Sequence, residues 1–175
     1  MNIVLIGYRC SGKTVVGKIL ARDLGRDFLD TDEKIEENTG SSIETIISRE
    51  GWNHFRDVEK RVIEEVSSRD HLVISTGGGV VVDRGNRENL KRNGWLVWLE
   101  AEAQVIKDRM EREHRSGKIR PSLTGTDPLD EIKGVLNTRL PLYQEAGDFM
   151  VDTSFLSTRE AAARILKALP NGLKG

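Results

Sequence analysis

The stretch of the chain with the clearest chemical signature is GYRCSGKT, at residues 7–14. A glycine, four residues and then Gly-Lys-Thr is the spacing of a phosphate-binding loop, whose backbone N–H groups line a concave nest around an anion. In such a loop Lys13 contacts the outer phosphates of a nucleotide, and the Thr14 hydroxyl ligates the accompanying Mg²⁺. A helix after the loop adds free N–H groups and the positive end of its dipole. The stretch therefore predicts a binding site for a nucleotide and Mg²⁺.

The residues on either side of this loop fit the same interpretation. Residues 2–6 form a short apolar run with β-branched side chains, typical of a strand buried on both faces of a parallel sheet. After the loop, apolar residues recur at helical spacing as far as Gly25, which is expected to end a helix. Strand, loop and helix thus occur in the required order. The expected nucleotide contacts are Gly7, Cys10, Ser11, Gly12, Lys13, Thr14 and Val15.

The composition limits the class of protein. The 175 residues suit one domain, and a net charge of −1 with a pI of about 6.3 gives no reason to expect nucleic acid or an anionic membrane as a partner. No apolar run approaches the roughly 18 residues of a membrane span. Because Met1-Asn2 leads straight into an expected strand, we expect no secretory signal. We expect a single domain over residues 1–175 that acts as a monomer in the cytoplasm.

Cys10 is the only cysteine, so the chain has no internal disulfide, as befits a reducing cytoplasm. We interpret Cys10 as a small residue that fits the phosphate loop. A redox switch is the alternative.

Strand-like runs alternate with helix-like segments along the rest of the chain, which predicts an α/β fold with a parallel sheet covered on both faces. Two pairs, Ser41 with Glu44 and Ser157 with Glu160, have the spacing of a capping box at a helix start. Further strands are expected at 28–29, 72–75, 95–99 and 149–151. Because ligands of such sheets bind beyond the carboxyl ends of the strands, three loops should meet at one site. These loops are 7–14, 30–32 and 77–79.

Asp30 and Asp32 follow the second expected strand. At extended spacing their side chains would point the same way. One carboxylate could then hold hydrated Mg²⁺, and the other could accept a proton from a substrate hydroxyl. The alternative is that they cap the next helix, at 33–38, with Asp32 as the capping residue.

The other two features of the expected site are an ion pair and a glycine turn. Arg56 and Glu59 lie three residues apart on an expected helix at 52–68, after a stop at Gly51, and spacing alone favours an ordinary surface ion pair. The glycines at 77–79 allow a backbone to approach a ligand closely, although a flexible tight turn is the alternative.

The segment from about 103 to 126 is rich in arginine and lysine and contains Arg109, Arg112 and Arg120. A helix is expected to run to about His114, where Ser116-Gly117 breaks it. A basic segment punctuated by glycine near a phosphate site suggests a lid that closes over the nucleotide. The alternative is a solvated, charged helix end.

Taken together, these motifs resemble those of the shikimate kinase family, within the nucleoside monophosphate kinase-like branch of phosphate-loop kinases. The resemblance covers nearly the whole chain and rests on an ordered set of motifs. These are GYRCSGKT, FLDTDEKIEENTG, GWNHFRDVEK, STGGG, IRPSL and TRLPLY. It implies a three-layer α/β/α fold with a five-stranded parallel sheet of order 2-3-1-4-5, a substrate-binding part at 32–61 and a lid at 111–125. The implied reaction is transfer of the ATP γ-phosphoryl group to the shikimate 3-hydroxyl, in aromatic amino-acid biosynthesis.

The resemblance also implies roles for single residues. Lys13 and Thr14 match residues that handle the phosphates and Mg²⁺, and Asp30 matches one that assists the metal through water. Asp32 matches the carboxylate that contacts the reacting hydroxyl, as a base or as a positioning group. The shikimate pocket is matched by Arg56, Gly78, Gly79 and Arg139. Arg120 matches a lid arginine that reaches the phosphates, and Arg109 one that packs on adenine.

Two departures from the family pattern concern the lid. Ser122 stands where the family usually has leucine, and extra residues between Arg109 and Arg120 leave open whether Arg109 or Arg112 packs on adenine. Kinases of other small acceptors share the fold. A nucleotide acceptor should need an arginine cluster for its phosphate, and no such cluster follows the second expected strand. A non-catalytic nucleotide switch would need no acidic pair.

Overall fold

The computed structural model of the 175-residue chain describes residues 1–115 and 128–173. Strands and helices alternate along it. The strands are β1 (Asn2–Ile6), β2 (Asp27–Asp30), β3 (Leu72–Ser75), β4 (Gly94–Glu100) and β5 (Phe149–Asp152). The helices are α1 (Lys13–Leu24), α2 (Thr31–Thr39), α3 (Ile43–Ser67), α4 (Arg84–Arg92), α5 (Ala103–Arg115), α6 (Pro128–Ala146) and α7 (Thr158–Ala168), with short 3₁₀ turns at Val80–Val82 and Asn171–Leu173.

The five strands form one sheet of order β2-β3-β1-β4-β5, and every neighbouring pair is parallel. This confirms the expected sheet and its order. β1 lies in the middle, where Ile3 is opposite Val73 of β3 and Trp95 of β4. All of its residues are buried, because apolar side chains on both of its faces are covered by helices.

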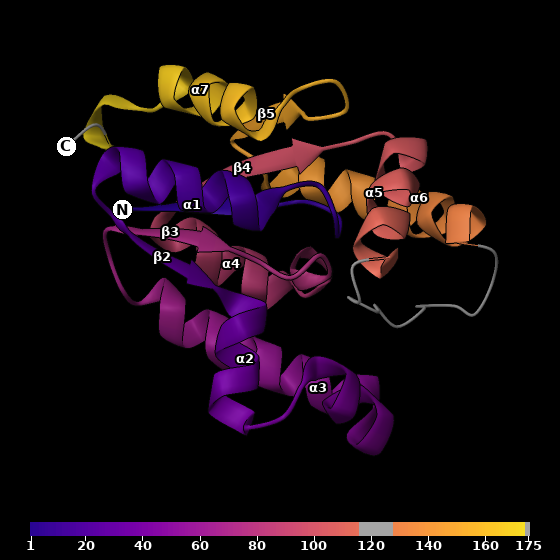
Figure 1. The fold of residues 1–175 in the computed structure, drawn as a ribbon. Coiled ribbons are helices and arrows are strands. Elements are labelled where there is room, and N and C mark those ends of the chain that lie inside the picture. Colours follow the sequence, from indigo (N-terminus) through magenta and orange to yellow (C-terminus); the bar gives the residue numbers. More distant parts are fainter. Residues whose placement is uncertain (116–127, 174–175) are drawn as a thin grey trace.

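Helices cover both faces of the sheet, which confirms the three-layer arrangement (Figure 1). On one face, side chains such as Leu5 of β1 pack with Leu20 of α1 and Ile165 of α7. On the other face, Ile6 of β1 packs with α3, α4 and α6, including the fully buried Ile63. Helix α5 and the start of α6 stand beyond the carboxyl end of β4 (Figure 1).

Several helix boundaries follow from local sequence. Gly25 ends α1 with a left-handed φ of 63°, and Ser157 and Glu160 form the predicted capping box of α7. Gly51, with φ 84° and ψ 171°, separates two helical parts of α3, as expected of a stop signal. Helix α4 was not singled out by the sequence analysis.

The predicted capping box of Ser41 and Glu44 is wrong. Ser42 is the N-cap of α3, and its side chain accepts a hydrogen bond from Thr45 N. Ser41 instead belongs to the turn after α2, where its backbone N–H donates to Thr39 Oγ1 at 3.4 Å. The turn between α2 and α3 begins at Gly40, with φ 65°, and is one residue longer than the sequence pattern suggested, so the N-cap of α3 is residue 42 instead of 41.

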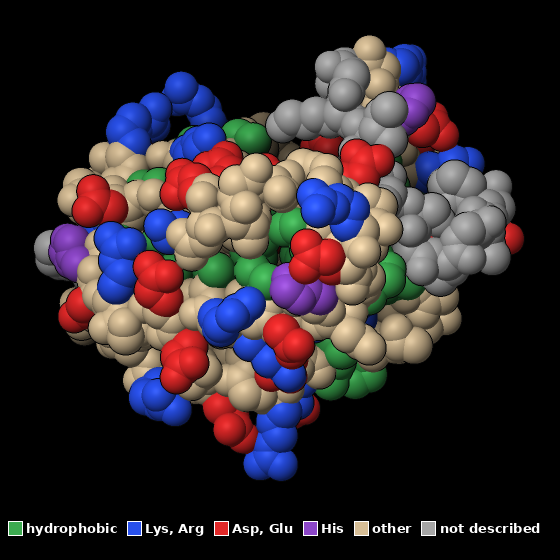
Figure 2. Space-filling model, turned by 90° about the horizontal axis from the view of Figure 1, so that it is seen from below, with side chains coloured by type: hydrophobic (Ala, Val, Ile, Leu, Met, Phe, Trp, Pro, Cys, Tyr) green, Lys and Arg blue, Asp and Glu red, His purple; other side chains and the backbone are tan. Residues whose placement is uncertain are grey.

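Acidic and basic side chains are mixed over the face seen from the side of α2 and α3, and neither sign forms a large patch there (Figure 2). Within residues 1–115 and 128–173, no helix is both long and apolar enough to cross a membrane.

Candidate active site

Three loops meet at the carboxyl ends of β1, β2 and β3. The loop after β3 is bonded to the loop after β2, because Gly77 N donates to Thr31 Oγ1 at 3.1 Å. It also touches the loop after β1, since a side chain at Gly78 would lie 2.9 Å from Arg9 N. The sequence analysis predicted that these loops converge, and parallel strands bring them to one edge of the sheet.

The loop after β1 has the backbone shape of a phosphate nest. Gly7 and Gly12 have φ of 143° and 99°, and Cys10 has a positive φ of 61°. Any side chain at Gly7 would collide with the carbonyl oxygen of Leu99 on β4. The Ser11 hydroxyl is buried and has no hydrogen-bond partner within the described part of the chain, which is uncommon for a buried hydroxyl.

Lys13 is the first residue of α1 and is only 7% exposed. Its Nζ donates hydrogen bonds to the carbonyl oxygens of Gly7 at 2.9 Å and Tyr8 at 2.8 Å. The ammonium group is therefore held across the loop rather than extended into solvent. A cation at this place is suited to bind an anion that enters the nest. Val15, also predicted to contact the nucleotide, has an exposed fraction of 53%.

Thr14 and Asp30 lie together where β1 and β2 end. Thr14 Oγ1 donates to Asp30 Oδ2 at 2.9 Å, and Ser75 Oγ at the end of β3 lies 3.4 Å from the same hydroxyl. Hydroxyl and carboxylate oxygens are hard ligands, and Mg²⁺ is usually bound by one or two such groups together with phosphates. The donor set at Thr14 and Asp30 therefore fits this ion. Elsewhere in the described residues, no group of three or more Asp, Glu, His or Cys side chains could hold a metal ion.

The expected extended arrangement of Asp30 and Asp32 is wrong. Asp30 ends β2 and is the N-cap of α2, where its Oδ1 accepts from Asp32 N at 3.0 Å. Asp32 belongs to the first turn of α2, because helix formation starts at Thr31. The capping residue is thus Asp30 and not Asp32. The Asp32 carboxylate faces the loop after β3, since a side chain at Gly77 would lie 2.7 Å from its Oδ1.

Arg56 and Glu59 on α3 form a largely buried ion pair, so the interpretation as an ordinary surface pair is wrong. Arg56 Nη1 donates to Glu59 Oε2 at 2.7 Å, and the Glu59 side chain is only 2% exposed. The guanidinium also lies over the rings of Trp52 and Phe55. It reaches the glycine turn, where a side chain at Gly79 would overlap it. The close approach of Arg56 is a physical reason for glycine at this position.

Arg139 on α6 reaches the same turn. Its Nη1 donates to the carbonyl oxygen of Gly78 at 3.0 Å, and Tyr143 Oη donates to the same oxygen at 2.5 Å. Arg56 and Arg139 thus both contact the turn of Gly78 and Gly79. Tyr143, which is fully buried, was missed because its position in a helical apolar pattern marks it only as a core residue.

Burial changes the proton affinity of two groups in this cluster. Burial raises the pKa of the Glu59 carboxyl above its ordinary value, against the opposing effect of Arg56 and Arg139. Burial also raises the pKa of the Tyr143 hydroxyl, which keeps it protonated and able to donate to Gly78.

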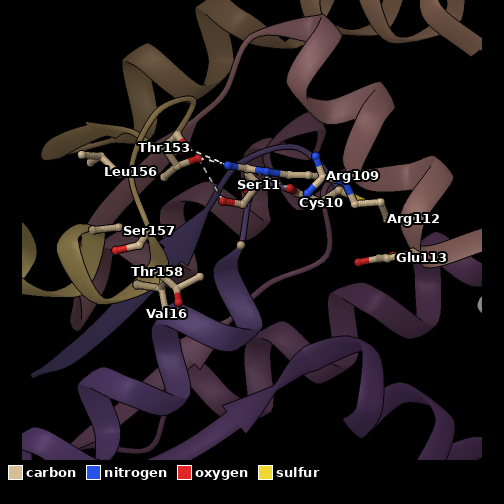
Figure 3. A pocket seen from close by; sticks show the side chains of 12 residues that line it. Cys10, Ser11, Val16, Arg109, Arg112, Glu113, Thr153, Leu156, Ser157 and Thr158 are labelled. Carbon is tan, nitrogen blue, oxygen red and sulfur yellow. Dashed lines mark hydrogen bonds between the residues drawn. The ribbon is translucent and has the colours of Figure 1, made fainter. Parts of the chain in front are cut away.

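A cavity of about 290 Å³ lies beside the phosphate loop, between α5 and the segment that leads from β5 into α7. Figure 3 shows Arg109, Arg112 and Glu113 on the α5 side and Leu156, Ser157 and Thr158 opposite them. The Arg109 guanidinium donates to Cys10 O, Thr153 Oγ1 and Thr153 O at 3.2, 3.2 and 2.6 Å. Burial lowers the pKa of this group. Both candidate adenine-packing arginines therefore line the cavity, but Arg109 is anchored to its wall.

The loop after β5 contributes to the site, and the sequence analysis did not consider it. Thr153 follows directly after β5 and is only 3% exposed. The signal was available, because this loop also leaves the carboxyl end of a strand in the parallel sheet. The start of α6 is joined to the phosphate loop by an ion pair between Arg9 and Glu131.

Most of the predicted lid at 111–125, including Arg120, Ser122 and the break at Ser116-Gly117, lies outside the described residues. The described part, 111–115, continues α5 to Arg115, close to the predicted end at His114.

Comparisons with known proteins find relatives of the whole chain. The family model described as shikimate kinase matches residues 9–170. The shikimate kinase of Thermodesulfovibrio yellowstonii is 43% identical over 95% of this chain and 93% of its own length. A solved structure of shikimate kinase from Acinetobacter baumannii in complex with shikimate is 38% identical, with a TM-score of 0.89 over 95% of this chain and 91% of that chain. Shikimate kinase from Aquifex aeolicus has a TM-score of 0.82 and 31% identity over 100% of both chains.

Proposed function

The chain belongs to the shikimate kinase family, which makes it a shikimate-phosphorylating kinase, and we propose that the loops after β1, β2 and β3 divide the work of this reaction. The reaction transfers the γ-phosphoryl group of ATP to the 3-hydroxyl of shikimate and supplies shikimate 3-phosphate for aromatic amino-acid biosynthesis through chorismate. One observation carries the assignment of residues. The phosphate nest, the Asp30–Asp32 segment and the two arginines around Gly78 and Gly79 open onto one edge of the sheet.

The phosphate nest binds the triphosphate of ATP. Backbone N–H groups of the loop and the N-terminus of α1 surround the phosphates, and Lys13 contacts the outer ones. Thr14 and Asp30 are the residues that would hold Mg²⁺, which when bound would supply positive charge next to the transferred phosphoryl group. Because Thr14 and Asp30 are already hydrogen-bonded, their oxygens need little rearrangement.

Asp32 contacts the reacting hydroxyl of the acceptor. The first turn of α2 places it facing Gly77 of the glycine loop, where an added side chain would also meet Glu59. A carboxylate there orients the hydroxyl and accepts its proton as the oxygen attacks phosphorus.

Arg56 and Arg139 bind the carboxylate of shikimate. Planar guanidinium groups suit a carboxylate because they donate parallel hydrogen bonds to its two oxygens. Glu59 fixes Arg56 in place through the bond of 2.7 Å, and the glycines at 78 and 79 let both arginines and the acceptor approach the backbone. The buried Glu59 therefore positions Arg56 and does not itself need to contact the acceptor.

The cavity beside α5 receives the adenosine part of ATP. Arg109 forms its fixed wall and packs on adenine, with Arg112 further along α5 at the same cavity. Arg120, which lies outside the described residues in the part at 111–125 that we assign as a lid, contacts the phosphates. The protein is a monomeric, single-domain cytoplasmic enzyme whose substrate-binding part, residues 32–61, contributes Asp32 and Arg56 to the acceptor site.

The test compares acceptors in a coupled assay of ADP release, with shikimate, quinate, gluconate and nucleoside monophosphates side by side. Shikimate should give by far the highest kcat/KM. The second comparison is shikimate against its methyl ester. Removing one partner of a buried charge pair costs about 2–5 kcal/mol, or roughly thirty- to several-thousand-fold in kcat/KM. Arg56→Ala should therefore lose most of the preference for the acid. A variant that discriminates as well as the wild type would mean that the carboxylate binds elsewhere.

A further inference from the structure

Thr153 lies at a junction of three parts of the nucleotide site. It follows β5, and its backbone N–H donates to the carbonyl oxygen of Glu100 at the end of β4 at 2.9 Å. Its hydroxyl lies within hydrogen-bonding distance of Glu100 O, at 2.8 Å, and of Ser11 O in the phosphate loop, at 3.2 Å. The hydroxyl also accepts a hydrogen bond from Arg109 on α5. One buried side chain thus connects the phosphate loop, the end of β4 and α5.

The hydrogen-bonding capacity of this hydroxyl is matched to its surroundings. A threonine hydroxyl has one proton and two lone pairs. Its proton can be donated to Glu100 O, at 2.8 Å, or to Ser11 O, at 3.2 Å, and the shorter distance favours Glu100 O. A lone pair then remains for Arg109. Valine, with the same shape, could supply neither bond.

Arg109 is held by the phosphate loop and Thr153 together. Its Nη1 contacts Cys10 O and Thr153 Oγ1, and its Nη2 donates to Thr153 O at 2.6 Å. Figure 3 shows the dashed bonds that join Arg109 to Thr153 and Thr153 to Ser11, among the residues that line the cavity. The guanidinium is therefore held by contacts within the chain, and two of these three hydrogen bonds are made to Thr153.

We propose that Thr153 is a positioning residue for nucleotide binding, whose hydroxyl fixes the Arg109 guanidinium against the phosphate loop. Arg109 can form the wall for a base only in a defined orientation. Because the hydroxyl already holds the guanidinium in that orientation, nucleotide binding costs less side-chain conformational entropy. The proposal rests on the proposed function, since it takes the cavity of about 290 Å³ as the place of the adenosine group.

The test measures binding of ADP by calorimetry to Thr153→Val, Thr153→Ser and the wild type. Thr153→Val should raise the Kd for ADP about tenfold, equivalent to about 1.4 kcal/mol. Thr153→Ser, which keeps the hydroxyl, should stay within about threefold of the wild type. Binding of shikimate should be unchanged in both, because Thr153 does not line the acceptor side. Thr138→Val, an exposed threonine on α6, controls for the general effect of the change.

A double-mutant cycle tests whether Thr153 affects ADP binding through Arg109 or only through the stability of the fold. If Thr153 acts through Arg109, then Thr153→Val should add little in an Arg109→Ala background, whereas independent effects would add. Thr153→Ala serves the same cycle if the valine variant does not fold. Equal ADP affinity in wild type and Thr153→Val, or full additivity, would overturn the proposal while leaving the kinase function intact. A wild type that neither binds ADP nor phosphorylates shikimate would overturn the function itself.

Discussion

The Thr14 hydroxyl donates a hydrogen bond of 2.9 Å to the carboxylate of Asp30, which lies 16 residues further along the chain. Asp30 also caps α2 through its other oxygen, so its side chain is fixed at both ends. The two groups proposed to hold Mg²⁺ are therefore positioned by contacts within the chain. Such preorganisation matters because catalysis here depends on positioning and charge stabilisation more than on covalent chemistry.

Lys13→Ala should reduce kcat about 10²–10³-fold, because the variant loses a preorganised donor to charge that develops in the transition state. The measurement is turnover at saturating ATP, Mg²⁺ and shikimate, with circular dichroism to show that the protein is folded. Lys18→Ala is the matched control, since Lys18 lies on the same helix with 58% of its side chain exposed. Turnover close to wild type in Lys13→Ala would refute the role of the phosphate loop.

Asp32→Asn should lower kcat much more than it raises KM for shikimate. The amide keeps the size of the side chain and some hydrogen bonding, but it cannot take the proton, and general-base catalysis contributes about 10²–10⁴-fold. Steady-state kinetics over a range of shikimate concentrations give the two parameters separately. Glu33→Gln, the same change at the next, exposed residue, should have no such effect. If kcat survives and only KM rises, Asp32 binds the acceptor without acting as a base.

Arg139→Lys should raise KM for shikimate roughly tenfold or more, because an ammonium group cannot reproduce two parallel bonds to a carboxylate and such bonds contribute about 1.5–3 kcal/mol. Binding of ADP, measured alone by calorimetry, should not change. Arg61→Lys on α3, at an exposed position, is the control for the substitution. An equal loss of ADP and shikimate binding would indicate damage to the fold instead.

Glu59 should make the free energy of unfolding depend on pH. Burial raises its pKa in the folded state above the value of about 4.3 for an unfolded chain, so the folded protein binds this proton more tightly. The resulting stabilisation is fully present below the unfolded pKa and is lost as pH rises through the folded pKa.

The measurement compares Glu59→Gln with the wild type by urea unfolding at several pH values from about 4 upward. The stability of the wild type relative to Glu59→Gln should decrease as pH rises. Glu64→Gln, at an exposed position on the same helix, should show no such trend. A relative stability that rises with pH would contradict the direction of the shift.

Ser42→Ala should lower the free energy of unfolding by about 1 kcal/mol, because it removes the N-cap hydrogen bond to Thr45 N. Ser41→Ala should change it by less than about 0.5 kcal/mol, since the bonds of Ser41 in this turn involve its backbone. Urea unfolding of both variants decides which serine is the cap. A larger loss for Ser41→Ala would favour the boundary predicted from sequence.

The amino-acid sequence by itself determined the parts of this protein that depend on local pattern. The strand of residues 2–6, the phosphate loop and the helix that begins at Lys13 follow from apolar periodicity and from glycines at positions that need positive φ. The capping box of Ser157 is likewise local. The order of the strands and the roles of most site residues came from resemblance to a family, because spacing does not say which strands become neighbours.

Only the tertiary structure decided which distant groups meet. Whether Glu59 is a surface residue or a buried anchor depends on what packs over α3, and spacing along a helix cannot tell. The Thr153 hydroxyl bonds to a carbonyl 142 residues away, and Arg109 contacts one 99 residues away. Such partners are brought together by the packing of strands and helices that are distant in the sequence. A backbone carbonyl is present in every residue, so no pattern of residue types can reveal which carbonyl accepts the bond.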